Sequence, residues 1–193
     1  MGTTKPIRKM EDIKKLECYF REKEEWRNYT LVVIGLNTAL RISDILELKW
    51  HDVYNFADMK YKEHIVLKEK KTEKETQIKL NCRSIEALDS FRQVIVELTP
   101  QLYIFKSSRT HENRPINRYQ AYKIINQAGK EIGLDYAISC HSLRKTFGYQ
   151  AWQQGISPAL LMEIYNHSSM EITKRYLSIN QDDKDSAFLQ VIL

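Results

Sequence analysis

Four side chains near the end of the chain have the types and the spacing to act on an anion such as a phosphate. His141 and Arg144 stand three apart in a segment of helical apolar periodicity, so both lie on one face of a helix. His167 comes one segment later, and Tyr176 follows it after nine residues. Arginine and histidine bind phosphate oxygens, and a tyrosine hydroxyl is a nucleophile. If consecutive short helices bring them together, these groups converge on one anion.

Capping signals divide this stretch into helices. Gly155 is expected to end the helix that carries His141 and Arg144. Ser157 followed by Pro158 then opens a second helix, in the manner of an N-cap with proline at the first helical position. This second helix should bury an apolar stripe that consists of Leu160, Leu161 and Ile164.

The second helix should end near Asn166, a residue that tolerates left-handed backbone geometry. Ser168 and Glu171 then match a capping box, which predicts a last short helix carrying Tyr176. A single histidine after a helix is usually a cap or a surface group, and a tyrosine on a short helix usually packs. On their own, therefore, His167 and Tyr176 do not establish a site.

Two motifs in this stretch match a known pattern. HSLRKTF (141–147) and NHSSMEITKRYLSI (166–179) together resemble the tyrosine recombinases of the phage integrase family, whose pattern is H-x-x-R, then G-H, then a tyrosine nine residues on. The chain departs from it at Tyr165-Asn166, where the family usually has Leu-Gly. Asparagine can take the turn conformation that glycine normally supplies, so activity should survive.

The resemblance implies a role for each of the four residues. Tyr176 would attack a scissile phosphate in DNA and form a 3′-phosphotyrosyl link. Arg144 would clamp the non-bridging oxygens and His167 would donate a further hydrogen bond. His141 would assist proton movement or bind phosphate. No cofactor and no metal is implied by this chemistry.

An arginine follows directly after a segment that reads as a central helix. Asn28 can cap YTLVVIGLNTAL (29–40), which is apolar nearly all round. Arg41 comes next, and burying an arginine there is costly unless it meets an anion. From these residues alone the anion is either a local carboxylate, such as Asp44 or Glu47, or a phosphate.

The segment NTALRISDILEL resembles the family's T-G-x-R-x-S-E-L-x-x-L box. Ser43 and Asp44 open the next expected helix, with Ala39 and Asp44 in the places where the family usually has Gly and Glu. The resemblance implies that Arg41 joins Arg144 in binding the phosphate oxygens.

A lysine-rich turn separates two β-branched runs. HIVL (64–67) and TQIKL (76–80) predict the strands of a hairpin, and a charged turn between them is usually just solvated. In the family, however, a hairpin in this place presents a lysine to the leaving oxygen. Lys71 is the closest match to that lysine, with Lys70 and Lys74 as alternatives.

Further helices should surround these elements. Residues 6–26 predict an amphipathic helix, and 83–98 predict another that Thr99-Pro100 would stop. Asn117 should cap a helix that buries Tyr122, Ile125 and Ala128 and ends at Gly133. Three basic residues near it either contact the DNA backbone or are merely solvated, namely Arg114, Arg118 and Lys123.

Length and composition fit one domain. The 193 residues are 42% hydrophobic, and we expect a single mainly α domain of α+β class over residues 1–193, with a small antiparallel sheet. We expect no N-terminal DNA-clamping (core-binding) domain in this chain. No apolar run approaches the roughly 20 residues of a membrane helix, so a soluble, cytoplasmic protein is expected. The family resemblance implies a bacterial or phage origin and association with the nucleoid when the protein is bound to DNA.

Charge and cysteine content narrow the partners. The net charge of +5 favours a polyanion, in this case double-stranded DNA, although charge alone is weak evidence. Three widely spaced cysteines, expected to be buried, argue against a disulfide framework or a zinc site; they are Cys18, Cys82 and Cys140. No set of histidines and carboxylates has recognisable metal-ligand spacing, and a Cys-His hydrolase is equally unsupported.

We therefore expect a metal-independent site-specific DNA recombinase or integrase, monomeric when free and tetrameric on paired DNA sites. Two alternatives remain, a DNA-binding regulator that keeps the fold without cleaving and a type IB topoisomerase-like relaxer. The apolar residues of the tail, Phe188, Leu189, Val191 and Ile192, should be buried on their own domain or in a groove of a neighbouring copy.

Overall fold

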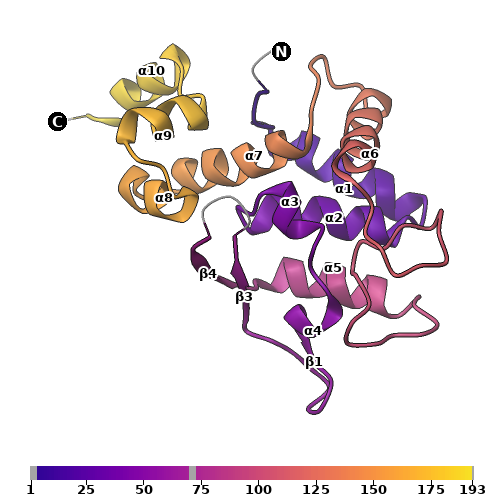
Figure 1. The fold of residues 1–193 in the computed structure, drawn as a ribbon. Helices are drawn as coiled ribbons and strands as arrows, with labels where there is room; N and C mark the ends of the chain where they lie inside the picture. Colours follow the sequence, from indigo (N-terminus) through magenta and orange to yellow (C-terminus); the bar gives the residue numbers. More distant parts are fainter. Residues whose placement is uncertain (1–3, 70–72, 193) are drawn as a thin grey trace.

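Helices dominate the computed structural model, which describes residues 4–69 and 73–192 (Figure 1). In chain order the helices are α1 (Met10–Glu22), α2 (Trp26–Asn37), α3 (Ile42–Ile45), α4 (Trp50–Val53), α5 (Cys82–Arg92), α6 (Arg118–Glu131), α7 (Cys140–Gln153), α8 (Pro158–Tyr165), α9 (Met170–Leu177) and α10 (Gln181–Gln190). The strands are β1 (Tyr54–Asn55), β2 (Lys60–Tyr61), β3 (His64–Lys68) and β4 (Glu75–Lys79). The predicted mainly α class is confirmed, with two small antiparallel sheets in the described part instead of one.

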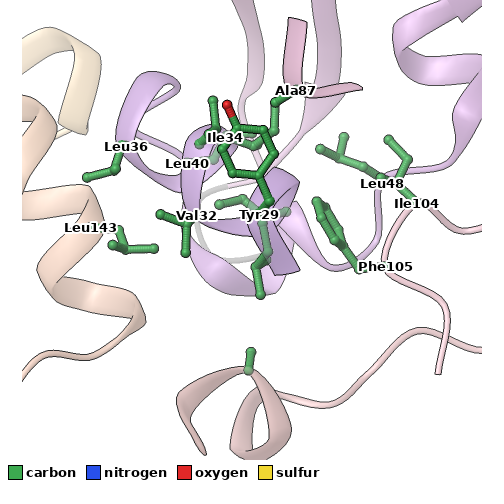
Figure 2. Packing of buried hydrophobic residues seen from close by; sticks show 14 of the residues in the cluster. Tyr29, Val32, Ile34, Leu36, Leu40, Leu48, Ala87, Ile104, Phe105 and Leu143 are labelled. Carbon is green, nitrogen blue, oxygen red and sulfur yellow. The ribbon is translucent and has the colours of Figure 1, made fainter. Parts of the chain in front are cut away.

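Helix α2 lies at the centre of the core, as its apolar sequence predicts. All its residues from Tyr29 to Leu36 are buried, and it packs against α1, α5 and α7. Figure 2 shows side chains of α5, α7 and the segment around Phe105 gathered about it. The helix begins at Trp26, so Asn28 is not its cap; the Asn28 amide instead donates to the Glu25 carboxylate. Burial of each large apolar side chain here contributes about 1.5–3 kcal/mol to the free energy of folding. Helix α2 is therefore a stable element for the residues that follow it.

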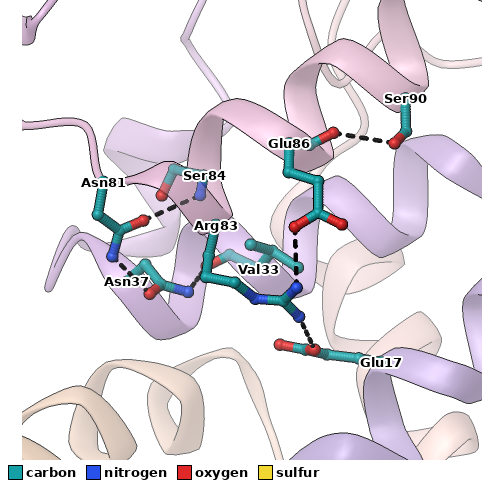
Figure 3. Close-up of polar contacts among 8 residues, drawn as sticks. All are labelled: Glu17, Val33, Asn37, Asn81, Arg83, Ser84, Glu86 and Ser90. Atoms are coloured by element: carbon teal, nitrogen blue, oxygen red, sulfur yellow. Dashed lines mark hydrogen bonds and ion pairs between the residues drawn. The ribbon is translucent and has the colours of Figure 1, made fainter.

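Helix α5 is joined to its neighbours by polar contacts at its first turn (Figure 3). The Asn81 side chain caps the helix by accepting from the Ser84 backbone N–H, and its amide donates to Asn37 at the end of α2. Arg83 reaches Glu17 on α1 with a nitrogen–oxygen distance of 2.6 Å. These contacts fix α1, α2 and α5 relative to one another at one end of the core.

Several predicted boundaries are wrong because apolar spacing continues outside helices. Helix α5 ends at Arg92, six residues before the predicted end, yet Ile95 and Leu98 still pack on the core from an irregular segment. The helix expected after Arg41 is the single short turn α3. On α6, correctly capped by Asn117, Tyr122 is 44% exposed rather than inward.

The predicted hairpin is present as β3 and β4, which pair in antiparallel register from His64 opposite Lys79 to Lys68 opposite Glu75. Ile65 points into the core and is fully buried. One end of the hairpin lies near the turn between α8 and α9, where Lys74, just before β4, contacts Asn166. Residues 70–72, which include Lys70 and the predicted Lys71, lie outside the described residues.

Helices α8 and α9 close over α7 around a second, smaller cluster. Its buried members are Ala39, Leu161, Tyr165 and Leu177, and Phe147 and Trp152 of α7 pack against it. Leu160, predicted inward, is 48% exposed, because α8 buries only one side against α7 and α9. Gly148 of α7 faces this cluster. A Cβ atom at this position would lie 2.4 Å from the Tyr165 hydroxyl, so the close approach of α8 to α7 requires glycine.

Two further expectations are corrected. Cys18 and Cys82 are exposed, so the expected burial is wrong for these two, whereas Cys140 is partly buried against the large core. Cys18 lies on the outer side of α1, away from Leu16 and Phe20. The tail is not buried on its own domain, since its apolar residues are 66–90% exposed. Within residues 4–69 and 73–192 no helix is long and apolar enough to cross a membrane.

Candidate active site

Arg144 is held in place by Tyr165. It lies on α7, capped by Ser139, and is only 4% exposed. Its guanidinium carbon sits 4.7 Å from the centre of the Tyr165 ring, and Nη2 donates to the Tyr165 backbone carbonyl over 3.4 Å. The Tyr165 hydroxyl in turn donates to the Arg144 carbonyl over 2.7 Å. This reciprocal pair ties α7 to the end of α8, and it restricts the arginine to one orientation.

The turn after α8 presents His167. Asn166 takes the predicted left-handed conformation, with φ of 53°. The imidazole stacks on Tyr165 with ring centres 5.2 Å apart, and Nδ1 lies 3.1 Å from the hydroxyl of the fully buried Thr173. Nε2 is therefore the ring nitrogen left for a ligand. The cap of α9 is Ser169 rather than the predicted Ser168, since its hydroxyl accepts from the Ile172 N–H.

Tyr176 sits among three rings. Its ring centre lies 5.1 Å from that of His141, 4.9 Å from that of His167 and 4.8 Å from that of Tyr165. The phenolic oxygen is buried and makes no hydrogen bond of ordinary geometry to a described residue. The guanidinium groups of Arg144 and Arg41 nevertheless lie close enough to oppose the rise in the pKa of the phenol that burial causes, so two cations act on this oxygen.

Arg41 reaches the same place from the other side. It is the extended residue at the start of α3, and its Nη1 lies 2.5 Å from Oε2 of Glu69, 28 residues further on. This ion pair uses a carboxylate of the hairpin rather than the local Asp44 or Glu47 considered from sequence.

One cleft of about 680 Å³ contains the predicted groups. It is lined by Arg41, Ile42, Ser43, Arg118, Cys140, His141, Arg144, Asn166, His167, Ile172 and Tyr176. Five of the six predicted site residues are thus brought together, and Lys71 lies outside the described residues. Of its alternatives, Lys74 is described, and its ammonium is 3.5 Å from the Asn166 side-chain oxygen at the edge of the cleft.

Burial and positive charge set the protonation of the site. Partial withdrawal from water, with Lys145 and Arg144 nearby, lowers the pKa of His141 to about 4, and the same withdrawal and the two arginines lower the pKa of His167. Both imidazoles are therefore neutral at neutral pH. Burial raises the pKa of Tyr176 although Arg144 and Arg41 oppose this, so the resting phenol keeps its proton.

Cys140 is not an activated nucleophile. It lines the cleft, but burial raises the pKa of its thiol to about 12, which leaves almost no thiolate at neutral pH. No group of three or more histidines, cysteines and carboxylates suited to a metal occurs in the described part of the chain.

Sequence reasoning missed Glu69, Thr173 and the part that Tyr165 plays. Glu69 and its partner are far apart in the chain, and no spacing rule links them. Thr173 lies one turn after Ser169, the cap of α9, and a threonine at such a position is ordinarily interpreted as a packing residue. Tyr165 stands where the family usually has leucine, and this departure was the signal that its side chain contacts the neighbouring site residues.

Comparison with known proteins decides the family. The Phage integrase family matches residues 8–183, most of the chain. The chain belongs to the phage integrase family. It is 41% identical over 192 residues to a probable integrase/recombinase, YoeC, of Bacillus subtilis strain 168, with 97% of each protein covered. It is 23% identical to the tyrosine recombinase XerA of Pyrococcus furiosus, over 88% of this chain and 56% of that protein.

Solved structures of recombinases share the fold. A crystal structure of XerA recombinase superposes with a TM-score of 0.76 at 21% identity, over 98% of this chain and 66% of that one. A post-cleavage complex of the XerH recombinase with its difH substrate gives a TM-score of 0.73, also at 21% identity, over 97% of this chain and 53% of that one. At such sequence identities the similarity establishes the fold alone. The chain spans between about half and two thirds of the length of these longer recombinases.

Proposed function

We propose that this integrase-family chain is a site-specific DNA recombinase whose nucleophile is Tyr176. One observation carries the proposal: Arg41, Arg144, two neutral histidines and a buried phenol line one cleft. Family membership and the recombinases among its relatives support recombination over the non-cleaving regulator, since binding alone does not need this set.

The proposed chemistry uses the groups that line the cleft. The Tyr176 oxygen attacks the scissile phosphorus, forming the O–P bond of a 3′-phosphotyrosyl link as the bond to the 5′ oxygen breaks. Arg41 and Arg144 bind the non-bridging oxygens and offset the charge that develops there. The phenol proton passes to a neutral imidazole, and His141 and His167 both lie within ring contact of Tyr176. His167, once protonated, donates to the phosphate.

The departing 5′ oxygen needs a proton from the opposite side. We assign this to a hairpin lysine, Lys71, with Lys70 and Lys74 as alternatives. The position of Lys74 at the edge of the cleft supports the hairpin as the source. Because the phosphotyrosyl link conserves the energy of the broken ester, religation needs no ATP, and no metal enters any step.

The same proposal includes double-stranded DNA as the partner and a homo-tetramer on paired sites, formed from monomers. The net charge of +5 supports DNA binding, and the exposed apolar residues of the tail support contact with a neighbouring copy. We further propose that residues 1–193 act as one catalytic domain.

The first prediction tests the nucleophile directly. A pool of nicked suicide duplexes with randomised sequence, incubated with the protein, should yield a covalent protein–DNA adduct that resists denaturation in SDS. Tyr176→Phe should abolish the adduct while leaving retention of the same duplexes unchanged, since only the attacking oxygen is removed. Tyr119→Phe, an exposed tyrosine of α6, is the matched control and should react like the wild type.

The outcomes separate the alternatives. Binding without any adduct across the recovered sequences would favour the regulator, and EDTA sensitivity would overturn metal independence. Duplexes recovered from the adduct then define a site for strand exchange. Relaxation of supercoiled plasmid without exchange between two such sites would favour the topoisomerase-like activity.

A further inference from the structure

A buried carboxylate lies behind Arg41, one of the arginines that line the cleft. Glu69 follows directly after β3 and is only 1% exposed, and its Oε2 pairs with Nη1 of Arg41. The same oxygen accepts from the side-chain amide of Asn166 over 3.4 Å. A buried carboxylate is tolerated only where it is paired, so these contacts fix where both partners lie.

Glu69 contacts two residues that line the cleft but does not line the cleft itself. Arg41 and Asn166 both line the cleft, whereas Glu69 does not. If Glu69 occupied the place of the phosphate and moved away when the phosphate bound, its carboxylate would have to lie in the cleft. Glu69 instead holds the guanidinium from the protein side, through one of the two terminal nitrogens. The other N–H groups stay available to a ligand, since guanidinium has five.

The Asn166 contact extends this arrangement to the histidine turn. Asn166 directly precedes His167, and it also accepts from the Lys74 ammonium of the hairpin over 3.5 Å. Glycine, the family's usual residue at this position, supplies the left-handed backbone but has no amide. The asparagine therefore adds a bridge from Glu69 to the turn that presents His167.

We propose that Glu69 is a positioning residue: it fixes the Arg41 guanidinium for bidentate binding of the scissile phosphate and, through Asn166, sets the distance between Arg41 and the His167 turn. The inference rests on the proposed recombinase function for its consequence, and on the ion pair for its geometry. Orientation of this kind matters because a displacement of about 1 Å at a reacting centre costs on the order of 100-fold in rate.

The test compares two charge-removing variants of one hairpin. Glu69→Gln keeps the shape of the side chain and removes its charge. Glu73→Gln makes the same change at a carboxylate whose side chain is 82% exposed and which pairs only loosely with Lys68, at 4.0 Å. At saturating suicide duplex, Glu69→Gln should slow adduct formation by about 10- to 100-fold, while Glu73→Gln stays within about 3-fold of the wild type.

A double-mutant cycle shows whether Glu69 acts through Arg41. In an Arg41→Lys background the Glu69→Gln change should add less than about 2-fold, because residues that act as a unit are not additive. A merely structural role would add its full effect in either background. Asn166→Gly keeps the left-handed turn and removes the bridge to Glu69 together with the longer contact to Lys74, so a loss of about 3- to 10-fold is expected even if Glu69→Gln folds poorly.

A readout independent of DNA is the ¹⁵N NMR signal of the Arg41 guanidinium. Rotation about its Cζ–Nη bonds should be hindered in the wild type and in Glu73→Gln, and averaged in Glu69→Gln. Signals already averaged in the wild type, cleavage by Glu69→Gln as fast as by Glu73→Gln, or full additivity with Arg41→Lys would each overturn the inference. If the wild type forms no adduct on any duplex, the proposed function fails, and the NMR comparison still decides whether Glu69 orients Arg41.

Discussion

The two halves of the site rest on hydrophobic clusters of very different size. Arg41 follows Leu40, which belongs to the large core around α2, and that core extends through most of the described helices and the hairpin. Tyr176 and His167 stand on α9 and the turn before it, where the buried cluster consists of Ala39, Leu161, Tyr165 and Leu177. Helix α7 serves both, with Leu143 in the large core and Phe147 against the small cluster.

This difference teaches how the protein separates binding from attack. Local opening costs least where few apolar side chains are buried, so α8 and α9 should open more readily than α2. In the proposed mechanism, the arginine side of the cleft is then fixed before DNA binds, while the proposed nucleophile Tyr176 stands on the more easily displaced part. Arg144 joins the two, because its backbone is on α7 and its guanidinium lies on the Tyr165 ring.

The largest expected effect comes from removing that connection. Arg144→Ala should slow adduct formation by about 10²- to 10³-fold, the usual cost of losing one donor to a developing oxyanion. It should also speed amide hydrogen exchange in α8 and α9 more than in α2, because Tyr165 loses the partner that covers its ring.

Arg114→Ala is the control for this change, since Arg114 is exposed and pairs with Glu112 in a surface loop. Equal acceleration of exchange in α2 and in α9 after Arg144→Ala would show that the two clusters unfold together. The proposed division of the site would then be wrong.

The same division explains what sequence could predict. Caps and spacing are local signals, so Gly155, Ser157 and Pro158 predicted the boundary between α7 and α8, and Asn166 itself predicted the left-handed turn that ends α8. The family motifs identified the cleft residues, and the structure brings Arg41 and Arg144 to one cleft as that interpretation requires.

What sequence could not predict depends on tertiary contacts. Nothing near Arg41 distinguishes Glu69 from Asp44 as its partner, because only the folded hairpin brings Glu69 there. Apolar spacing suggested that Leu160 faces inward, but α8 has neighbours on one side only. Ile95 likewise packs from an irregular segment, which period alone cannot tell from a helix.

A smaller effect should come from the glycines beneath the two clusters. Gly148→Ala places a methyl group 2.4 Å from the Tyr165 hydroxyl and 2.7 Å from Leu177, so it should lower the free energy of unfolding by about 1–3 kcal/mol and slow cleavage as Tyr165 shifts. Gly35→Ala meets the end of the Leu143 side chain at 2.8 Å in the large core.

Gly35→Ala should therefore destabilise to a similar degree but leave the cleavage rate within about 3-fold, since the shift occurs away from the nucleophile. Chemical denaturation measures the first quantity and suicide-duplex kinetics the second. If Gly35→Ala slowed cleavage as much as Gly148→Ala, the nucleophile would depend on both clusters alike.

The smallest expected effect is a pH dependence of stability that originates at the boundary between the clusters. Folding lowers the pKa of His141 from 6.5 to about 4, so folding favours the neutral imidazole. That contribution is complete above pH 6.5 and is lost as pH falls from 6.5 toward 4, where the unfolded chain takes up the proton first. Because the residue remains in contact with solvent, we expect only about 1 kcal/mol between pH 7 and pH 5.

His141→Asn should remove this part of the acid destabilisation, measured as the difference in unfolding free energy between pH 7 and pH 5. His111→Asn, in an exposed loop, is the matched control. The site of the effect sharpens the comparison further, because His141 contacts the Tyr176 ring and α9 belongs to the small cluster. Acid should therefore speed hydrogen exchange in α9 before α2, and uniform acceleration through both would mean that protonation of His141 weakens the whole domain rather than the nucleophile's support.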